Sequence, residues 1–394
     1  MKILVLNCGS SSLKYQLINM ENDEVIASGK YERIGEKEAF MTHKALGKKL
    51  TIKHVALDHT EAIDFTLKQL VNPEYKVIDS LDEINAIGHR LVHGGEKIKE
   101  STIIDENVIN IVKECTDLAP LHNPAGIMGI EACQKVMPGK PMVAVFDTAF
   151  HQTMTKEKFI YPIPYEYYEK YGIRKYGFHG TSHMYVSQRL AEIENNKNLK
   201  IVTCHLGQGS SICAVKEGKS IDTSMGLTPL GGIPMVTRSG DLDPSVVTFL
   251  MKKENMTAQE VEDVLNKKSG VQGISGLDPD FRVIEAASYG ENDKAEIAIK
   301  VFTYSIASYI AKYAVAMGGI DAIVFTGGVG ENQINIRKSI CEQLSFMGVD
   351  LDVESNNMRG EEKLITKKDS KIRAYVIPTN EELMIAKETE RLIK

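Results

Sequence analysis

Two patterns of hydrophobic and polar positions alternate along the chain. Short apolar runs predict buried strands at residues 3–6, 13–18, 25–32, 86–88, 142–146, 321–325 and 375–377. Amphipathic stretches predict helices at residues 59–71, 293–317 and 381–393, the second of which is stopped by Gly318 and Gly319. The first three strands follow one another closely, which indicates an antiparallel meander. Because strands and helices alternate, the pattern predicts an α/β fold.

The first predicted strand and its turn recur near the middle of the chain. Residues 3–12 resemble residues 201–210, and in this alignment Gly9 corresponds to Gly207. Each copy is a strand, a turn rich in glycine and serine, and a second strand-like run. Either two short units are alike by chance, or the chain consists of two related halves with one such turn in each.

Composition narrows the class of protein without defining its chemistry. The 394 residues are 43% hydrophobic and 25% charged, which is typical of globular chains of two or three domains. A net charge of −6 argues against a general nucleic-acid binder. The six cysteines have no paired spacing, which favours reduced thiols. No apolar stretch is long enough for a signal peptide or a membrane span, so we expect a cytoplasmic protein with no membrane and no nucleic-acid partner.

Three glycine-rich turns follow predicted strands, at residues 7–12, 205–211 and 326–332. Glycine lets backbone N–H groups approach an anion closely, and a helix N-terminus adds a favourable dipole. None of the turns fits the Walker or the dinucleotide-binding pattern. Each alone could be a plain turn, but the three together favour a phosphate-binding site.

Charged residues follow predicted strands or lie in polar turns. Arg90 and Arg238 could each pair with a carboxylate or a phosphate, although an isolated arginine is more often part of a surface ion pair. Asp147, Glu381 and Glu382 come after strands, where a carboxylate suits Mg²⁺. The same position suits an acid in the first turn of a helix, which is the interpretation we favour for Glu382.

Histidines and tyrosines gather between the two halves. His179 and His183 have the spacing of a helical zinc site, but the glutamate of the zinc-protease motif is missing and zinc is not favoured. Of the 15 tyrosines, six fall within residues 161–176. A lid, a subunit contact or ordinary packing around a loop would each explain this cluster.

Taken together, eight stretches resemble, in the same order, the acetokinase family of the acetate and sugar kinase/Hsc70/actin superfamily. They are residues 7–14, 88–95, 121–124, 143–150, 176–183, 237–241, 325–332 and 378–382. The resemblance implies two duplicated actin-like (ribonuclease H-like) domains around a nucleotide cleft, and it would explain the internal repeat. It implies an N-terminal domain of residues 1–149 with about 382–394, and a C-terminal domain of residues 150–381 that carries most of the nucleotide site. It also implies a homodimer.

The activity that the resemblance implies is reversible, direct in-line phosphoryl transfer from ATP to acetate, giving acetyl phosphate and ADP, with Mg²⁺ or with Mn²⁺ in its place. The matching positions imply three catalytic residues, Asp147, His179 and Arg238, and two metal ligands, Asn7 and Glu381. The implied substrate-binding residues are Arg90, Val92, Leu121, Phe178 and Pro229. The implied nucleotide-binding residues are Lys14, His205, Leu206, Gly207, Gln208, Gly209, Asp280, Phe281, Arg282, Gly328, Val329, Gly330, Glu331 and Asn332.

The physics of this reaction agrees with these positions. A carboxylate is already a nucleophile at neutral pH, so catalysis rests on alignment and on neutralising the oxygens of the transferred phosphoryl group. We therefore expect no large proton-transfer role for Asp147, for which holding Mg²⁺ or its water is an equal alternative. Because one methylene is worth only about 1–3 kcal/mol in a pocket, propionate should be a poorer but real substrate.

Four positions depart from the family pattern, one of which is Thr155 in place of a usual Pro. The family usually has Asn where Gln208 stands, Glu at Gly231 and Gly at Val236. These changes leave the phosphoryl donor open, so that GTP or pyrophosphate is one alternative to ATP. A non-enzymatic ATP-binding module that works by domain closure is the other alternative, and the intact set of charged residues disfavours it.

Overall fold

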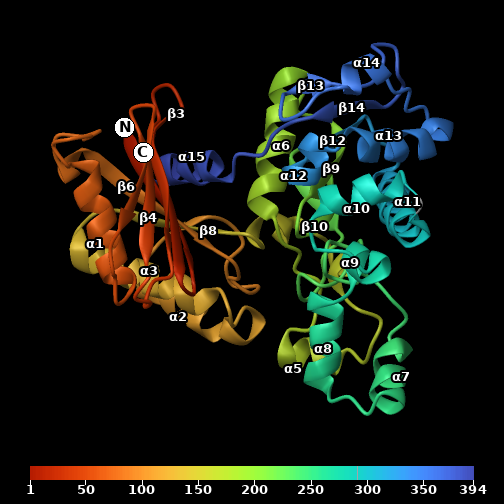
Figure 1. Ribbon diagram of the computed structural model, residues 1–394, viewed down its shortest axis with the longest axis horizontal. Helices are drawn as coiled ribbons and strands as arrows, with labels where there is room; N and C mark the ends of the chain where they lie inside the picture. The colour runs from red at the N-terminus through yellow and green to blue at the C-terminus, as the bar shows by residue number, and fades with distance from the viewer. Residues whose placement is uncertain (291) are drawn as a thin grey trace. The chain divides into compact units, whose positions relative to one another are not determined.

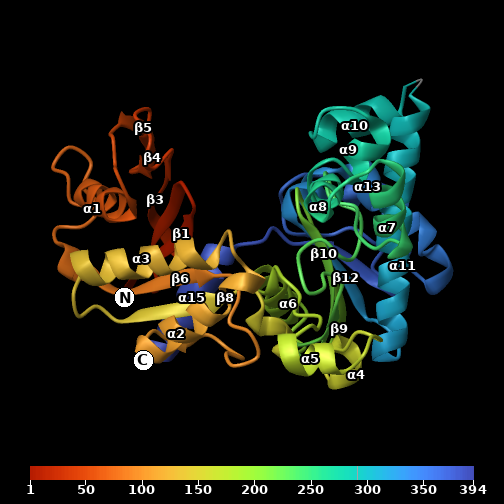
Figure 2. The same ribbon diagram turned by 90° about the horizontal axis from the view of Figure 1, so that it is seen from below.

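The computed structural model describes residues 1–290 and 292–394, and the chain divides into two compact units (Figures 1 and 2). Unit 1 comprises Met1–Gln152 and Asn380–Lys394, and unit 2 comprises Thr153–Thr379. The boundaries predicted at 149/150 and 381/382 lie a few residues away. Glu381 falls in unit 1 because Asn380 caps the closing helix, α15 (Glu381–Ile393), all of which packs on unit 1.

The strands of unit 1 form one sheet in the order β5-β4-β3-β2-β1-β6-β8-β7. They are β1 (Lys2–Gly9), β2 (Ser12–Asn19), β3 (Glu24–Glu32), β4 (Phe40–Ala45), β5 (Lys48–Lys53), β6 (Ile84–Leu91), β7 (Thr102–Ile103) and β8 (Met142–Phe146). The first five are antiparallel, and β6 and β8 continue the sheet parallel to β1. The sequence did not predict β4 and β5, because these strands are largely polar and carry no apolar run.

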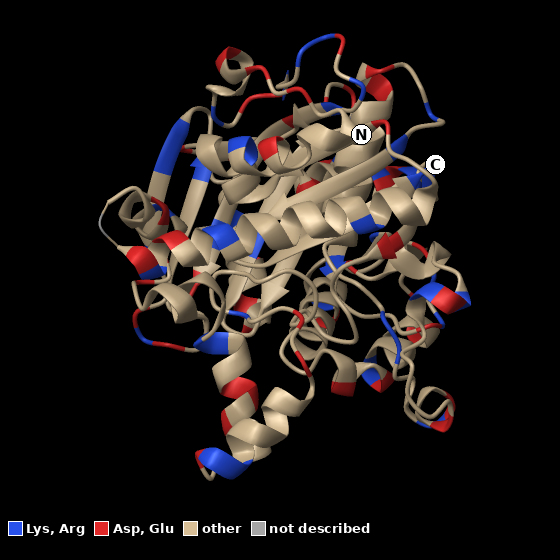
Figure 3. Ribbon diagram, turned by 90° about the vertical axis from the view of Figure 1, so that its right-hand side faces the viewer, with Lys and Arg blue, Asp and Glu red and all other residues tan. Residues whose placement is uncertain are grey.

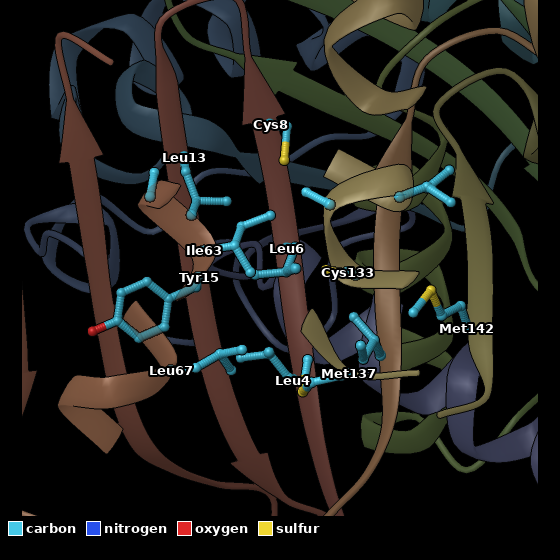
Figure 4. Packing of buried hydrophobic residues seen from close by; sticks show 14 of the residues in the cluster. Leu4, Leu6, Cys8, Leu13, Tyr15, Ile63, Leu67, Cys133, Met137 and Met142 are labelled. Carbon is cyan, nitrogen blue, oxygen red and sulfur yellow. The ribbon is translucent and has the colours of Figure 1, made fainter. Parts of the chain in front are cut away.

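Helices cover both faces of this sheet. They are α1 (His59–Leu70), α2 (Glu106–Glu114), α3 (Asn123–Val136) and α15, with the short 3₁₀ helices η1 (Leu81–Glu83), η2 (Thr116–Leu118) and η3 (Ala149–Thr153). Alternate residues of β1, such as Leu4 and Leu6, pack with α1 and α3 (Figure 4). On the other face α15 lies so close to Gly88 of β6 that a Cβ there would meet Thr389 at 2.6 Å and Ile385 at 2.7 Å. Burial on both faces explains the unbroken apolar run of β1.

The strands of unit 2 form a sheet in the order β11-β10-β9-β12-β14-β13. They are β9 (Lys200–Leu206), β10 (Ser210–Lys216), β11 (Lys219–Thr223), β12 (Ala322–Thr326), β13 (Lys363–Leu364) and β14 (Arg373–Val376). The helices are α4 (Lys156–Phe159), α5 (Glu166–Tyr171), α6 (Gly180–Ile193), α7 (Ser245–Lys253), α8 (Ala258–Lys267), α9 (Gly270–Ser275), α10 (Phe281–Ser288), α11 (Asp293–Met317), α12 (Gly327–Asn332), α13 (Ile334–Gln343) and α14 (Val353–Asn356), with the 3₁₀ helix η4 (Ser345–Met347).

Several predicted elements of unit 2 are confirmed and one differs. The helix predicted at 293–317 is α11, and it ends at Gly318 in the left-handed conformation, with φ of 66°. Residues 327–332, predicted as a glycine-rich turn, form the short helix α12 instead. Gly327 explains the difference, since its φ of 76° turns the chain directly from β12 into the helix.

The two units repeat one topology, which confirms the two related halves and the predicted α/β fold with duplicated domains. The order β3-β2-β1-β6-β8 of unit 1 matches β11-β10-β9-β12-β14 of unit 2. In both, three antiparallel strands are followed by two strands parallel to the first. The turns seen in the sequence repeat are the hairpins β1–β2 and β9–β10, in which Gly9 faces Ser12 and Leu206 faces Ser210.

Two further observations concern the described helices and the cysteine thiols. No helix in the two described ranges is long and apolar enough to cross a membrane. Each of the six cysteines is free and buried, and burial raises the pKa of the Cys8 thiol to about 12.

A buried histidine makes the stability of unit 1 depend on pH. His89 of β6 is only 2% exposed, and burial lowers its pKa from 6.5 to about 3. Below pH ~6.5 the unfolded chain therefore binds a proton that the folded chain does not, and stability falls as the pH decreases towards ~3. Between about pH 7.5 and pH 5.5, protonation linked to His89 should lower the free energy of unfolding by about 1.4 kcal/mol. Urea unfolding of the wild type and of His89→Gln at both pH values checks this, because the variant should lose correspondingly less stability.

Candidate active site

The carboxyl ends of parallel strands in unit 1 bring three predicted residues together. Arg90 lies near the end of β6, Asp147 directly follows β8, and Asn7 lies near the end of β1. Arg90 donates from Nε to Asp147 Oδ1 at 3.0 Å and from Nη2 to Asp147 Oδ2 at 2.6 Å. Its Nη1 lies 3.4 Å from Asn7 Oδ1. Both oxygens of the buried Asp147 carboxylate are thus engaged, which favours an orienting role over proton transfer.

Glu381, in the first turn of α15, completes this cluster. Burial raises the pKa of its carboxyl to about 7; Arg90 and Lys14 oppose the shift, and Asp147 and Glu382 add to it. Lys14 of β2 lies opposite Asn7 of β1 in the sheet, so it belongs to the same edge of unit 1. A cation near Glu381 would favour the ionised carboxylate.

The donor set around Glu381 fits a magnesium ion chemically. The Asn7 amide and the Glu381 carboxylate offer oxygen atoms, which Mg²⁺ prefers. Within the described ranges no group of three or more His, Cys, Asp or Glu side chains is placed to hold a metal. Mg²⁺ usually takes one or two protein ligands and fills its other positions with water and phosphate oxygens.

The four apolar residues predicted to contact the substrate divide between the units. Val92 and Leu121 belong to unit 1, and Phe178 and Pro229 belong to unit 2. Val92 and Phe178 are buried, at 8% and 3% exposure, whereas Leu121 is 76% exposed just before α3. Leu121 therefore presents an apolar surface outside the core of its own unit.

In unit 2 the β9–β10 hairpin gathers two predicted catalytic residues. His179 stands directly before α6 in the left-handed conformation, with φ of 57°. A Cβ at Gly209 would lie 3.3 Å from Nη1 of Arg238 and 3.5 Å from Cε1 and Nε2 of His179. Gly209 is thus the position at which both side chains meet the turn.

Arg238 carries a positive charge that the described residues leave without a carboxylate partner. Its Nη1 donates to the carbonyl oxygen of Pro229 at 3.3 Å and lies 3.7 Å from Sδ of Met235. Burial lowers its pKa, but a guanidinium stays protonated at neutral pH. This charge is therefore available to an anion, whereas the charge of Arg90 is shared with Asp147.

A cavity of about 990 Å³ opens beside the hairpin. Its walls include the predicted residues Gly207, Gln208, Asp280, Phe281, Arg282, Gly328, Val329 and Asn332. Small-molecule sites typically occupy ~300–1,000 Å³, so the cavity is large enough for a nucleotide. Its other walls include Glu285, Tyr289, Asn335, Asn357 and Arg359, which the sequence reasoning missed. These residues lie on α10, α13 and a loop, outside the glycine-rich and strand-end signals on which the prediction rested.

The other predicted nucleotide residues do not line the cavity. In the described residues they are Lys14 in unit 1 and His205, Leu206, Gly209, Gly330 and Glu331 in unit 2. Glu331 Oε1 accepts from the backbone N–H of Gly327 at 2.8 Å and of Thr379 at 3.1 Å, so it holds the start of α12 in place. The ring of His205 stacks on that of His179, with centroids 4.2 Å apart.

A buried arginine joins two parts of the cavity wall. Arg337 of α13 is fully buried and donates to the carbonyl oxygens of Gly330, Glu331, Asn356 and Met358 at 2.8–3.0 Å. These bonds tie α12 to the loop that carries Asn357 and Arg359. The burial lowers the Arg337 pKa to about 10.

The close contacts at Gly209 give a direct prediction. Gly209→Ala leaves the backbone unstrained, but its methyl group would lie 3.3 Å from Arg238 Nη1, which must move by a few tenths of an ångström, and would contact the His179 ring at 3.5 Å. Because misplacing a catalytic group by ~1 Å can cost about 10²-fold, we expect kcat to fall about 10-fold. Steady-state kinetics and thermal unfolding measure this. Gly290→Ala, whose added Cβ meets only Ala287 O at 3.5 Å, is the matched control; an unchanged kcat in Gly209→Ala would contradict the geometry.

Fold and site together define the class of the protein. Two units of one actin-like topology, with a nucleotide-sized cavity and a nearby guanidinium that pairs with no carboxylate among the described residues, define a phosphotransferase of the actin-like fold. The acetokinase family matches residues 2–387, and the chain belongs to this family, whose members transfer a phosphoryl group to a carboxyl acceptor.

Known proteins are similar to this chain over its whole length. The acetate kinase of Caldanaerobacter subterraneus subsp. tengcongensis is 61% identical over 398 residues, covering 100% of this chain and 99% of the relative. The crystal structure of Porphyromonas gingivalis acetate kinase is 47% identical with a TM-score of 0.97, and each chain is covered fully, at 100%. A propionate kinase from Francisella tularensis subsp. tularensis is 44% identical with a TM-score of 0.92, again with 100% of both chains covered.

Proposed function

We propose that the protein transfers the γ-phosphoryl group of ATP to acetate, reversibly. A carboxylate oxygen of acetate forms a bond to the γ-phosphorus, the bond from this phosphorus to the β,γ-bridging oxygen breaks, and ADP leaves with that electron pair. No strong base is needed, because the acceptor is already ionised at neutral pH. The products are acetyl phosphate and ADP.

The single observation that carries this proposal is the arrangement at the β9–β10 hairpin. A nucleotide-sized cavity is lined by Gly207 and Gly328, and next to Gly207 in the chain's β9–β10 turn Arg238 and His179 converge on Gly209. A nucleotide seated there would bring its phosphates towards a cation without a carboxylate partner. Such a reaction requires the negative charge on the oxygens of the transferred phosphoryl group to be neutralised.

The residues of unit 1 would supply the acceptor and the metal. Arg90, held by Asp147, would orient the acetate carboxylate, and Val92 and Leu121 of this unit would contact its methyl group. Asn7 and Glu381 would hold Mg²⁺, or Mn²⁺ in its place, which when bound would neutralise charge on the nucleotide phosphates. Asp147 would keep Arg90 in place and would not take a proton from the substrate.

Trapping the acyl phosphate with hydroxylamine tests the reaction. The purified protein is incubated with ATP, Mg²⁺, hydroxylamine and acetate, propionate or butyrate, and the hydroxamate is measured. We expect ATP-dependent acetohydroxamate, with Arg238→Ala as the matched inactive control. Nucleotide binding without hydroxamate from any short acid would instead support a non-enzymatic ATP-binding module and would overturn the proposal.

The same assay measures selectivity for the acyl chain. An apolar pocket discriminates one methylene by about 1–3 kcal/mol, which is about 10- to 200-fold. We therefore propose that acetate has the highest kcat/KM and that propionate follows within this range. A propionate preference, as the name of the Francisella tularensis relative suggests for that protein, would show as the reverse order.

The donor is expected to be a nucleoside triphosphate. Pyrophosphate would fill only a small part of the 990 Å³ cavity, whereas a nucleoside could use its far walls. Gln208 and Val236, which depart from the family pattern, both line this cavity, and Gln208 Nε2 lies 3.4 Å from the carbonyl oxygen of Pro279. Comparing ATP, GTP and pyrophosphate in the wild type and in Gln208→Asn tests the preference; turnover with pyrophosphate above that with ATP would contradict it.

We also propose that the chain forms a homodimer, and α11 offers a surface for it. Ile297, Val301, Tyr304 and Val315 are 40–84% exposed on the outer face of this helix. With Ser308 and Ala311 they are spaced alternately four and three residues apart, as in the seam of a helical pair. In Figure 3 the long helix crosses the view with few charged residues along its middle.

An antiparallel pairing of two copies of α11 would suit this seam. A two-fold axis through its centre would place each large side chain opposite a smaller one: Ile297 opposite Val315, Val301 opposite Ala311, and Tyr304 opposite Ser308. Analytical ultracentrifugation tests this, since Val301→Glu should yield monomers at concentrations where the wild type is dimeric. Phe346→Glu, at an exposed apolar residue of η4, should leave the dimer intact. A monomeric wild type would overturn the proposal.

A further inference from the structure

A chain of buried hydrogen bonds joins α6 to the sheet of unit 2 behind the predicted catalytic histidine. His179 Nδ1 lies 2.9 Å from Ser211 Oγ, and His183 Nε2 lies 2.7 Å from the same oxygen. His183 Nδ1 lies 2.7 Å from Thr203 Oγ1. Ser211, His183 and Thr203 are all fully buried. We call these four residues the α6 relay; the sequence reasoning assigned no role to Ser211 or Thr203.

The fold explains why these side chains meet. Val202 and Cys204 of β9 face the core beneath α11, so the alternate residues Thr203 and His205 face α6. Ser211 of β10 lies opposite His205 in the antiparallel pair and therefore faces the same side. The His179 and His183 positions, four residues apart, are one helical turn apart and both reach Ser211.

A carbonyl group near Thr203 indicates a direction for the relay. Thr203 Oγ1 lies 3.5 Å from the carbonyl oxygen of Cys213, and when its hydroxyl donates there, it accepts from the Nδ1–H of His183, 2.7 Å away. Neutral His183 then has a lone pair on Nε2, which accepts from the Ser211 hydroxyl. Having donated its only hydrogen there, Ser211 accepts from the Nδ1–H of His179.

The opposite edge of the His179 ring faces the phosphate turn. Its Nε2 and Cε1 atoms are the ones that lie 3.5 Å from a Cβ built at Gly209. The groups that face this ring include Arg238, whose Nη1 meets the same position at 3.3 Å, and His205, which stacks on it. With Nδ1–H held by Ser211, the proton that His179 gains or loses is the one on Nε2.

We propose that Ser211, His183 and Thr203 are positioning residues that fix the proton on Nδ1 of His179 and aim Nε2 at the transferred phosphoryl group. Protonated His179 then presents a charged Nε2–H donor there, and the relay need not rearrange. This inference rests on the proposed function for the role of His179, but its tautomer can be measured without turnover.

The first test is spectroscopic. In protein labelled with ¹⁵N-histidine, the His179 signals are assigned by comparison with His179→Gln. At high pH, neutral His179 should carry its hydrogen on Nδ1 in the wild type, and Ser211→Ala should shift it to a mixture of both tautomers. A wild-type ring protonated on Nε2 alone, or an unchanged tautomer in Ser211→Ala, would overturn the relay even if the protein were an active kinase.

The second test is kinetic and uses variants that keep the packing. Thr203→Val removes the hydroxyl with little change of shape and should lower kcat about 3- to 10-fold, as loss of one hydrogen bond would. KM for acetate and for ATP should stay within about twofold, and Thr203→Ser should restore kcat. Ser187→Ala is the control, since Ser187 is a buried serine of α6 that bonds only to Met184 O among the contacts described. A change in KM as large as the change in kcat, or no recovery of kcat in Thr203→Ser, would contradict the positioning role. If Ser211→Ala does not fold, the comparison of Thr203→Val with Thr203→Ser still tests the proposal.

Discussion

Replacing Arg238 by alanine is expected to lower kcat by about 10²–10³, the effect of removing one preorganised donor to a developing oxyanion. The structure gives the reason. The Arg238 guanidinium is partly buried, its partners among the described residues are a carbonyl oxygen and a thioether, and it meets His179 at Gly209. No carboxylate among the described residues pairs with this guanidinium, so its charge would be available to a transferred phosphoryl group. Steady-state kinetics in both directions of the reaction measures the loss.

Two controls separate charge from folding. Arg238→Lys keeps the charge but loses the planar fork, so it should recover only part of kcat, and added guanidinium ion should partly rescue Arg238→Ala. Arg189→Ala removes a surface arginine that pairs with Glu192 and Glu362 and should change kcat little. If Arg238→Ala retained kcat within about threefold, Arg238 would have no part in neutralising the transition state.

Replacing Arg90 by alanine is expected to raise KM for acetate and to lower kcat as well. In the proposed reaction Arg90 would offer the substrate carboxylate a guanidinium that two bonds to Asp147 hold in place near Asn7. Its loss also leaves the Asp147 carboxylate, 4% exposed, without its cation, which should cost about 3 kcal/mol of stability. Kinetics with varied acetate, together with thermal unfolding, measures both effects. Unchanged acetate kinetics would remove Arg90 from the site.

The partner variant Asp147→Asn distinguishes the two roles considered for this residue. The asparagine still accepts from Arg90 through one oxygen, so stability should fall less than in Arg90→Ala. If Asp147 only orients Arg90, kcat should fall by a similar factor at every pH. A selective loss of one limb of the pH profile would instead show that Asp147 moves a proton during the reaction.

The elements most accurately predicted from sequence are those whose pattern is local. The helices α11 and α15 and the strand β8 have the predicted bounds, because apolar periodicity and a stop at Gly318 are written in consecutive residues. The polar strands β4 and β5 were missed for the same reason. Their place in the sheet comes from pairing with β3 and with each other, which no local pattern records.

The residues of the candidate site also differ in whether a local sequence pattern marks them. Strand ends and glycine-rich turns pointed to Arg90, Asp147 and Gly209, since such positions are visible in the sequence. The far walls of the cavity were missed because Glu285 and Asn335 lie on ordinary helix surfaces. Ser211 and Thr203 were missed as functional residues because only the register of β9 with β10 turns them towards α6.

The sequence by itself therefore determined the class of fold, the repeat of its two halves, the family and most of the residue types that the chemistry needs. Only the tertiary structure decided which charges are paired. Arg90 lies 57 positions from Asp147 in the chain and is bound to it, whereas Arg238 meets no carboxylate among the residues described. The physical reason is that local pattern sets backbone conformation and burial, while the partner of a side chain is set by sheet order and register, which join residues far apart in the chain.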